Sequence, residues 1–162
     1  MTPEDVLYSV AETEPNNLPG NATALLLVPA LQGSSQLLGY GSGTQELATP
    51  YTNWSDPDYW RIELLAGDLV SVSVNTPDSA LDVYVELRND TDSQVAHSND
   101  EGQGSDSFIS RYEVIASGSY YVLVGKDYSS GGGSYDLQVD VARSIALALA
   151  LVLVVLHLDN YL

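Results

Sequence analysis

Acidic and amide side chains gather in two regions of the sequence, and both regions have the composition of a calcium site. The first region joins Glu12–Asn17, which reads Glu-Thr-Glu-Pro-Asn-Asn, to Asn53–Trp60. The second region consists of Asp78, Asp82, Ser98–Gly102 and Asp106. Calcium takes about six to eight oxygen ligands from carboxylates, amides and backbone carbonyls, in a flexible geometry. The residue types therefore favour calcium, although acidic turns are common and no EF-hand loop is present.

The spacing within the first region supports a shared site. Glu12 and Glu14 alternate, so in an extended segment they point the same way. Asp56 and Asp58 have the same spacing, with Pro57 between them. The pairs could also serve as the two carboxylates of a glycosidase, but a bound cation explains them more simply.

Motifs for catalysis are absent from the sequence. The two histidines, His97 and His157, stand apart from any nucleophile or metal motif. There is no Gly-x-Ser-x-Gly elbow, P-loop or His-Glu-x-x-His sequence. The run Gly131–Gly133 lacks the lysine and helix of a phosphate-binding loop, and we interpret it as a hairpin tip. The sequence therefore predicts a protein that is not an enzyme.

Composition limits the partners. The chain has 162 residues, 44% of them hydrophobic, and a formal net charge of −17. That hydrophobic fraction is enough for a folded domain, while the charge disfavours nucleic acid and anionic lipid as partners. The sequence contains no cysteine, which excludes disulfides and thiolate zinc sites.

Location is predicted to be extracellular or at the cell surface. Residues 1–11 lack the basic and apolar regions of a signal peptide, so either the protein is cytosolic or its signal lies outside this sequence. Three Asn-X-Ser/Thr sequons, at Asn21, Asn53 and Asn89, are candidate glycosylation sites and favour a surface glycoprotein. The second alternative, secretion, is the one that we expect.

Alternation of apolar and polar residues dominates the chain. In Asp68–Asn75, Val70, Val72 and Val74 share one face and serines occupy the other. Other segments with this period are Leu81–Arg88, Ser119–Gly125 and Tyr135–Val141. Short half-buried strands between turn clusters are typical of a β-sandwich or barrel.

A series of short motifs resembles the bacterial pre-peptidase C-terminal (PPC) domain, over roughly residues 10 to 142. The motifs in order are Glu12–Asn17, Ala22–Leu25, Asp56–Ile62, Ala66–Asp68, Leu81–Leu87, Ser98–Asp100, Gly118–Val122 and Gly133–Leu137. The resemblance implies an all-β, jelly-roll-like antiparallel β-sandwich, appended to secreted enzymes or surface proteins. The chain departs from the family in a longer Leu26–Asn53 link, where we expect an elaborated hairpin, and in its apolar tail. We also expect no peptidase domain before the module.

The resemblance also implies where calcium binds. Collagen-binding relatives of the family hold calcium near the N-terminal acidic linker. Carried over by motif, the ligand candidates are Glu12, Glu14, Asn16, Asn17, Asp56 and Asp58. A second and less well supported set consists of Asp82, Asn99 and Asp100. Calcium is the one cofactor that we expect.

The tail Ile145–Leu158 is apolar except for His157. As a helix its 14 residues would span about 21 Å, whereas a bilayer core needs about 30 Å. As a strand it places large side chains on one face, namely Ile145, Leu147, Leu149, Leu151, Leu153 and Val155. We expect donor-strand complementation of a neighbouring subunit. A membrane anchor and an intramolecular strand are the alternatives.

These observations divide the chain into an N-terminal extension (1–11), a β-sandwich (12–142) and an apolar tail (143–162). The function that we expect is a calcium-stabilised structural subunit of an extracellular filament or layer, with copies of itself joined head to tail. The alternative is an anchored or enzyme-appended module for cell adhesion or substrate binding, whose partner would be a matrix protein or a glycan.

Overall fold

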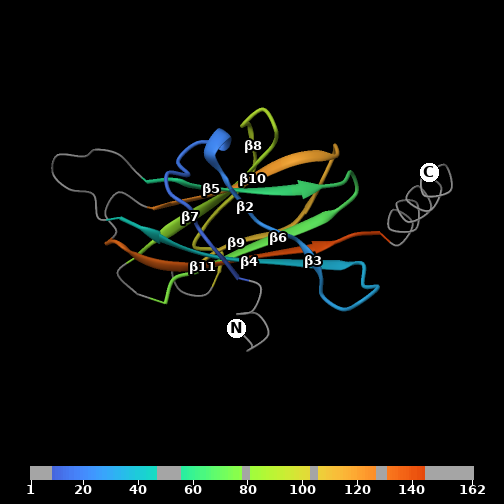
Figure 1. Ribbon diagram of the computed structural model, residues 1–162, viewed down its shortest axis with the longest axis horizontal. Helices are drawn as coiled ribbons and strands as arrows, with labels where there is room; N and C mark the ends of the chain where they lie inside the picture. Colours follow the sequence, from blue (N-terminus) through green and yellow to red (C-terminus); the bar gives the residue numbers. More distant parts are fainter. Residues whose placement is uncertain (1–8, 47–55, 78–80, 103–105, 127–130, 145–162) are drawn as a thin grey trace, which may run out of the picture.

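The computed structural model describes residues 9–46, 56–77, 81–102, 106–126 and 131–144. These residues form a sandwich of two β-sheets (Figure 1). The strands are β1 (Ser9–Ala11), β2 (Thr23–Ala24), β3 (Val28–Pro29), β4 (Gln36–Gln45), β5 (Asp58–Leu64), β6 (Leu69–Asn75), β7 (Val83–Arg88), β8 (Gln94–Asn99), β9 (Ser107–Glu113), β10 (Gly118–Lys126) and β11 (Gly133–Ala142). A short 3-10 helix, η2, spans Pro19–Asn21.

One sheet has the strand order β1-β4-β11-β6-β9, with β3 also paired to β4, and the other has the order β2-β5-β10-β7-β8. The predicted all-β sandwich is confirmed. The sheets are mixed and not purely antiparallel, because the short strands β1 and β2 run parallel to β4 and β5.

The core forms where the alternating faces meet. Val70, Val72 and Val74 of β6 are fully buried, as the sequence predicted. Trp60 of β5 is also fully buried and lies against the inner face of the opposite sheet at Gly41 of β4. Burying one face of each sheet against the other supplies the main favourable term for folding.

The first strands differ in part from the predicted boundaries. Ser9–Ala11, placed by the sequence in an N-terminal extension, form β1 and pair with Tyr40–Ser42 of β4. The expected hairpin in the long link is present in its described part, because β3 pairs antiparallel with the start of β4. Residues 47–55 of that link lie outside the described residues.

Strands β4 and β5 together define two ends of the sandwich. At the first, which we call the polar end, Gln45 closes β4 and Asp58 opens β5, and the two side chains are hydrogen-bonded. At the second, which we call the apolar end, Leu37 of β4 and Glu63 of β5 line one groove. The same two strands therefore position both the polar end around Asp58 and the groove at the apolar end.

The predicted donor strand, Ile145–Leu158, lies outside the described residues. Strand exchange and the head-to-tail filament that depends on it therefore stay predictions. Within the described part of the chain, no helix has the length and apolar character needed to cross a membrane.

Candidate metal centre

Three carboxylates meet at the polar end. Glu12 follows β1, Glu14 lies in the next loop and Asp58 is the first residue of β5. One oxygen from each lies within 4.8 Å of the others, and among the described residues this is the one cluster of acidic or histidine side chains with that spacing. Carboxylates this close repel one another unless a proton or a cation lies among them.

Glu12 is fixed in place by β4. Its backbone N–H donates to the carbonyl of Ser42 over 3.0 Å, which continues the pairing of β1. The backbone N–H of Thr44 donates to Glu12 Oε1 over 2.6 Å, and the hydroxyl of Thr44 donates to the same atom over 3.0 Å. The second carboxylate oxygen, Oε2, points toward the cluster and accepts a hydrogen bond from the hydroxyl of Tyr135 over 3.4 Å.

Asp58 is fully buried, with 0% of its surface exposed. Its Oδ2 atom accepts hydrogen bonds from Gln45 Nε2 and from the hydroxyl of Tyr135, each over 2.7 Å. The Tyr135 oxygen in turn accepts a hydrogen bond from Trp60 Nε1 over 3.0 Å. This buried network orients the Asp58 carboxyl group but brings it only neutral partners.

No described basic residue forms an ion pair with Asp58. The buried Lys126 instead donates to the backbone carbonyl of Glu46. Burial raises the pKa of Asp58 to about 9, partly offset by the Tyr135 hydrogen bond and reinforced by the charges of Glu12 and Asp56. Without a cation, Asp58 therefore carries a proton at neutral pH.

Asn16 adds an amide to the cluster and is also fully buried. Its backbone carbonyl accepts the N–H of Tyr59, which fastens the acidic loop to β5. Its side-chain oxygen faces only acceptors. Rotating the amide places the nitrogen 3.2 Å from Asp58 Oδ1 and 3.1 Å from Glu14 Oε1. The amide nitrogen suits the cluster without an ion, and the amide oxygen suits a cation bound among these groups.

Gln45 provides a second unsatisfied oxygen. Its Nε2 atom donates to Asp58 and to the carbonyl of Val124, but its buried Oε1 atom has no hydrogen-bond partner among the described residues. A buried acceptor without a partner is costly, and such atoms often mark an ion or a water. The donor set of carboxylates and amide oxygens therefore fits calcium in its chemistry.

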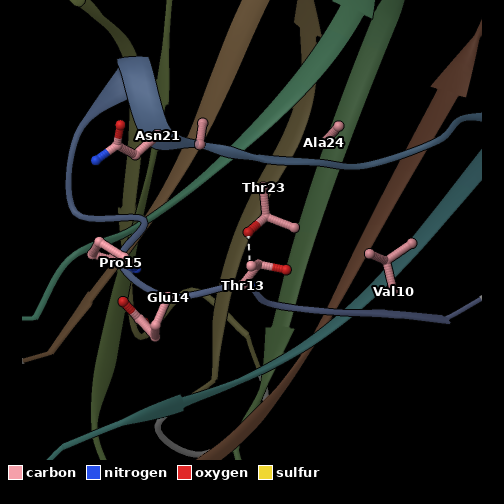
Figure 2. A pocket seen from close by; sticks show the side chains of 8 residues that line it. Val10, Thr13, Glu14, Pro15, Asn21, Thr23 and Ala24 are labelled. Atoms are coloured by element: carbon pink, nitrogen blue, oxygen red, sulfur yellow. Dashed lines mark hydrogen bonds between the residues drawn. The ribbon is translucent and has the colours of Figure 1, made fainter.

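The cluster is accessible to solvent on the side of Glu14. Glu14 is exposed and lines a shallow pocket of about 610 Å³ together with Val10, Thr13, Pro15, Asn21, Ala22, Thr23 and Ala24 (Figure 2). The N–H of Thr13 donates to Thr23 Oγ1, which holds the two walls together (Figure 2). Burial, partly offset by the Asn16 N–H, raises the pKa of Glu14.

Gly43 is needed for the close approach of these groups. A Cβ atom at this position would lie 2.4 Å from the hydroxyl oxygen of Tyr135 and 2.5 Å from Glu12 Oε2. Both distances are below any real contact, and Tyr135 is buried and unable to move away. A glycine inside a strand often marks such an approach.

The remaining predicted ligands lie at different distances from the cluster. Asn17 donates its amide to Asp56 Oδ1, and this pair borders the cluster without joining the three carboxylates. Asp82 precedes β7, and Asn99 ends β8. Asp100 follows with a positive φ of 67°. These three belong to no described cluster of three metal-binding side chains.

Several residues of the site were not identified from the sequence, namely Gly43, Thr44, Gln45 and Tyr135. The repeated glycines of β4, at alternate positions 39, 41 and 43, were an available signal. All three face the interior, where side chains of the opposite sheet or of the core approach closely.

Among the described sequons, Asn21 lines the same pocket as Glu14, whereas Asn89 follows β7 and His97 lies in β8, at one edge of the second sheet. Asn21 is exposed at the end of η2. The side chain of Asn89 accepts the N–H groups of Thr91 and Ser93 in the turn after β7. Asn53 lies outside the described residues. His97 is exposed and stacks on Tyr84 with ring centroids 6.0 Å apart.

Comparison with known families confirms the resemblance seen in the sequence. Residues 56–126 match the family model described as the bacterial pre-peptidase C-terminal domain. A search of curated proteins gives no match.

Three solved structures are similar over most of their length. PliG of Aeromonas hydrophila, a periplasmic inhibitor of g-type lysozyme, is 13% identical, with 82% of this chain and 98% of that chain covered and a TM-score of 0.49. The pre-peptidase C-terminal domain of a Bacillus anthracis collagenase is 19% identical, with 76% and 99% covered and a TM-score of 0.49. A PliG mutant of Escherichia coli is 14% identical, with 70% and 94% covered and a TM-score of 0.37.

Proposed function

We propose that this chain is a calcium-stabilised, non-catalytic accessory module that works outside the cell. The match of residues 56–126 to the pre-peptidase C-terminal domain supports the role of an appended module. The observation that carries the calcium proposal is the fully buried Asp58, with Glu12 and Glu14 within 4.8 Å and no described basic partner.

The residues that would hold the ion are Glu12, Glu14 and Asp58, with the amide oxygen of Asn16 beside them. When bound, calcium would supply the positive charge that these carboxylates lack. The acidic loop and β5 would then be held together through the ion as well as through the Asn16–Tyr59 hydrogen bond. Because the ion binds the folded state, it would stabilise that state by mass action.

The alternative expectation of an adhesion or substrate-binding role fits the same proposal. An appended module positions another domain by binding a matrix protein or a glycan. The calcium site would then keep the N-terminal loop ordered beside the sandwich, where the chain would join a neighbouring domain.

Calorimetric titration with calcium, after dialysis against chelator, tests the proposal. We expect binding together with a rise in the melting temperature of roughly 5–11 °C at a free calcium concentration of about 100 times Kd. Asp58→Asn keeps the shape of the side chain and its bond to Tyr135, and it should remove most of the binding and the rise.

Glu113→Gln is the matched control, since it removes one negative charge from an exposed position at the end of β9. It should leave both the binding and the temperature shift unchanged. An equal loss of calcium binding in Asp58→Asn and Glu113→Gln would mean that binding depends on the net charge of the protein and that there is no specific site at Asp58. No heat and no temperature shift in the unmodified chain would refute the calcium proposal.

A further inference from the structure

The apolar end of the sandwich contains a groove of about 310 Å³. Its lining is mostly aliphatic and consists of Ala24, Leu25, Leu26, Leu27, Leu37, Arg61, Glu63 and Arg143. Leu26, on the groove wall, has 70% of its surface exposed. Aliphatic lining and an exposed leucine at one place mark a surface suited to an apolar partner.

The groove exists because the chain leaves one sheet for the other at this point. Strand β2 pairs with β5 at Trp60 and Arg61, and Leu25 adds one more hydrogen bond to the carbonyl of Arg61. The chain then crosses through Leu25–Leu27 to β3 in the opposite sheet. In the described part of the chain, no strand pairs with the outer edge of β5 beyond Arg61.

Arg143 connects this groove to the apolar tail. Its guanidinium donates to both carboxylate oxygens of the buried Asp68, over 2.9 and 2.7 Å. Its backbone N–H donates to the carbonyl of Ser35 over 2.8 Å. Arg143 is thus held firmly at the groove wall, and the apolar segment begins two residues later, at Ile145.

We propose that the first part of the segment Ile145–Leu158 docks in the groove of its own chain. The large side chains Ile145, Leu147 and Leu149 share one face of the alternating pattern. An apolar cavity of about 150 Å³ accommodates a benzene-sized group, so the groove has room for about two such side chains. The open edge of β5 beside it offers backbone hydrogen bonds to an added strand.

Docking within one chain is favoured over exchange between copies by the short connection. A tethered segment acts at an effective concentration in the millimolar range when its linker can span the sites. Here the linker is Ser144 alone. This inference stands apart from the calcium proposal, because the groove and the carboxylate cluster lie at opposite ends of β4 and β5.

Disulfide trapping tests the docking cleanly, because the chain has no cysteine of its own. Leu26→Cys is combined in turn with Ile145→Cys, Leu147→Cys and Leu149→Cys, and each full-length double variant is oxidised at low concentration. A disulfide needs Cα atoms about 4.4–6.8 Å apart. We expect at least one pair to close within the monomer, seen as faster migration on a non-reducing gel and loss of two hydrogens from the intact mass.

The control pair is Ser134→Cys with Leu147→Cys. Ser134 is exposed and lies at the opposite end of β11 from Ala142, about 26 Å away along the strand, so it is far from the groove. That pair should stay reduced under the same conditions. A mixture of the single variants Leu26→Cys and Leu147→Cys should give no linked dimer. Dimers in the mixture would show exchange between copies and overturn the proposal, and failure of all three pairs to close would overturn it equally.

Discussion

Two aspartates of this sandwich are buried to the same extent but have different partners. Asp68 and Asp58 each have 0% of their surface exposed. Asp68, at the apolar end, accepts two hydrogen bonds from Arg143 and one from the backbone of Leu65. Asp58, at the polar end, has a tyrosine, a glutamine and two neighbouring glutamates. Asp68 therefore forms an ion pair with an arginine of the fold, whereas Asp58 forms no ion pair with a described residue.

The comparison explains why burial alone does not identify a binding site. A buried carboxylate with its own arginine is a complete structural unit. A buried carboxylate among other acids either carries a proton or binds a cation from solution. In a chain with a net charge of −17, Arg143 forms an ion pair with Asp68, and none of the five basic residues, all of which the structure describes, forms an ion pair with Asp58.

The largest effect is expected from removing the partner of Asp68. Arg143→Ala leaves a buried charge unpaired, which costs about 3–5 kcal/mol of unfolding free energy, measured by urea denaturation. Adding Asp68→Asn should recover part of that loss, because the buried charge is then gone. A loss below about 1 kcal/mol in the single variant would show that solvent reaches Asp68 and that the two aspartates do not differ in their need for a cationic partner.

The next effect is the pH dependence of calcium affinity. Asp58, with its pKa raised to about 9, must lose its proton before it can bind the ion. Affinity should therefore rise by about tenfold per pH unit, or about 100-fold from pH 6 to pH 8. Titration calorimetry in buffers of different ionisation heat would count the released protons. A flat profile would show that Asp58 is not a ligand.

The raised pKa of Asp58 also makes the unfolding free energy of the metal-free protein depend on pH. The folded-state pKa of Asp58 lies above its ordinary value of 3.8, so the folded chain holds a proton that the unfolded chain loses between these pH values. The contribution of Asp58 to the free energy of unfolding is therefore fully present below pH 3.8 and is lost as the pH rises toward about 9. In chelator, Asp58→Asn should flatten this part of the profile relative to the unmodified protein.

A smaller effect is expected from Gly43→Ala at the polar end. The added Cβ would displace Tyr135 or Glu12, and overpacking of this kind costs about 1–3 kcal/mol. The calcium response should fall as well. Gly20→Ala is the control, since a Cβ there meets nothing within 4 Å. If the two variants unfold at the same urea concentration, the close approach at Gly43 is not required.

The smallest effect is expected at the second acidic region. Asp100 is exposed and has a positive φ of 67°, a conformation that asparagine also adopts. Asp100→Asn should change the unfolding free energy by less than about 0.5 kcal/mol and leave the calcium-induced temperature shift intact. A loss of that shift would move the ion to the second region and contradict the assignment to Glu12, Glu14 and Asp58.

Much of the fold followed from local pattern, and much of the site did not. Alternation placed Val70, Val72 and Val74 in the core because one face of each strand is buried. The motif Glu12–Asn17 led to the acidic loop. The roles of Gln45 and Tyr135 depend on pairing between strands that are distant in sequence, such as Gly133 of β11 with Gln45 of β4. A single sequence contains no direct signal for that register.

The position of β11 has a consequence for how the molecule is made. β11 is the last described strand of the chain, yet it lies in the middle of its sheet, pairing with β4 over 36–45 and with β6 over 69–75 (Figure 1). Until residue 142 has left the ribosome, β4 and β6 have no common neighbour, and the sheet is open in its centre. Long-range pairing of this kind is formed late and slowly. A nascent chain of this design therefore cannot complete this sheet before β11 has been synthesised, and β4 and β6 wait for it with unpaired edges.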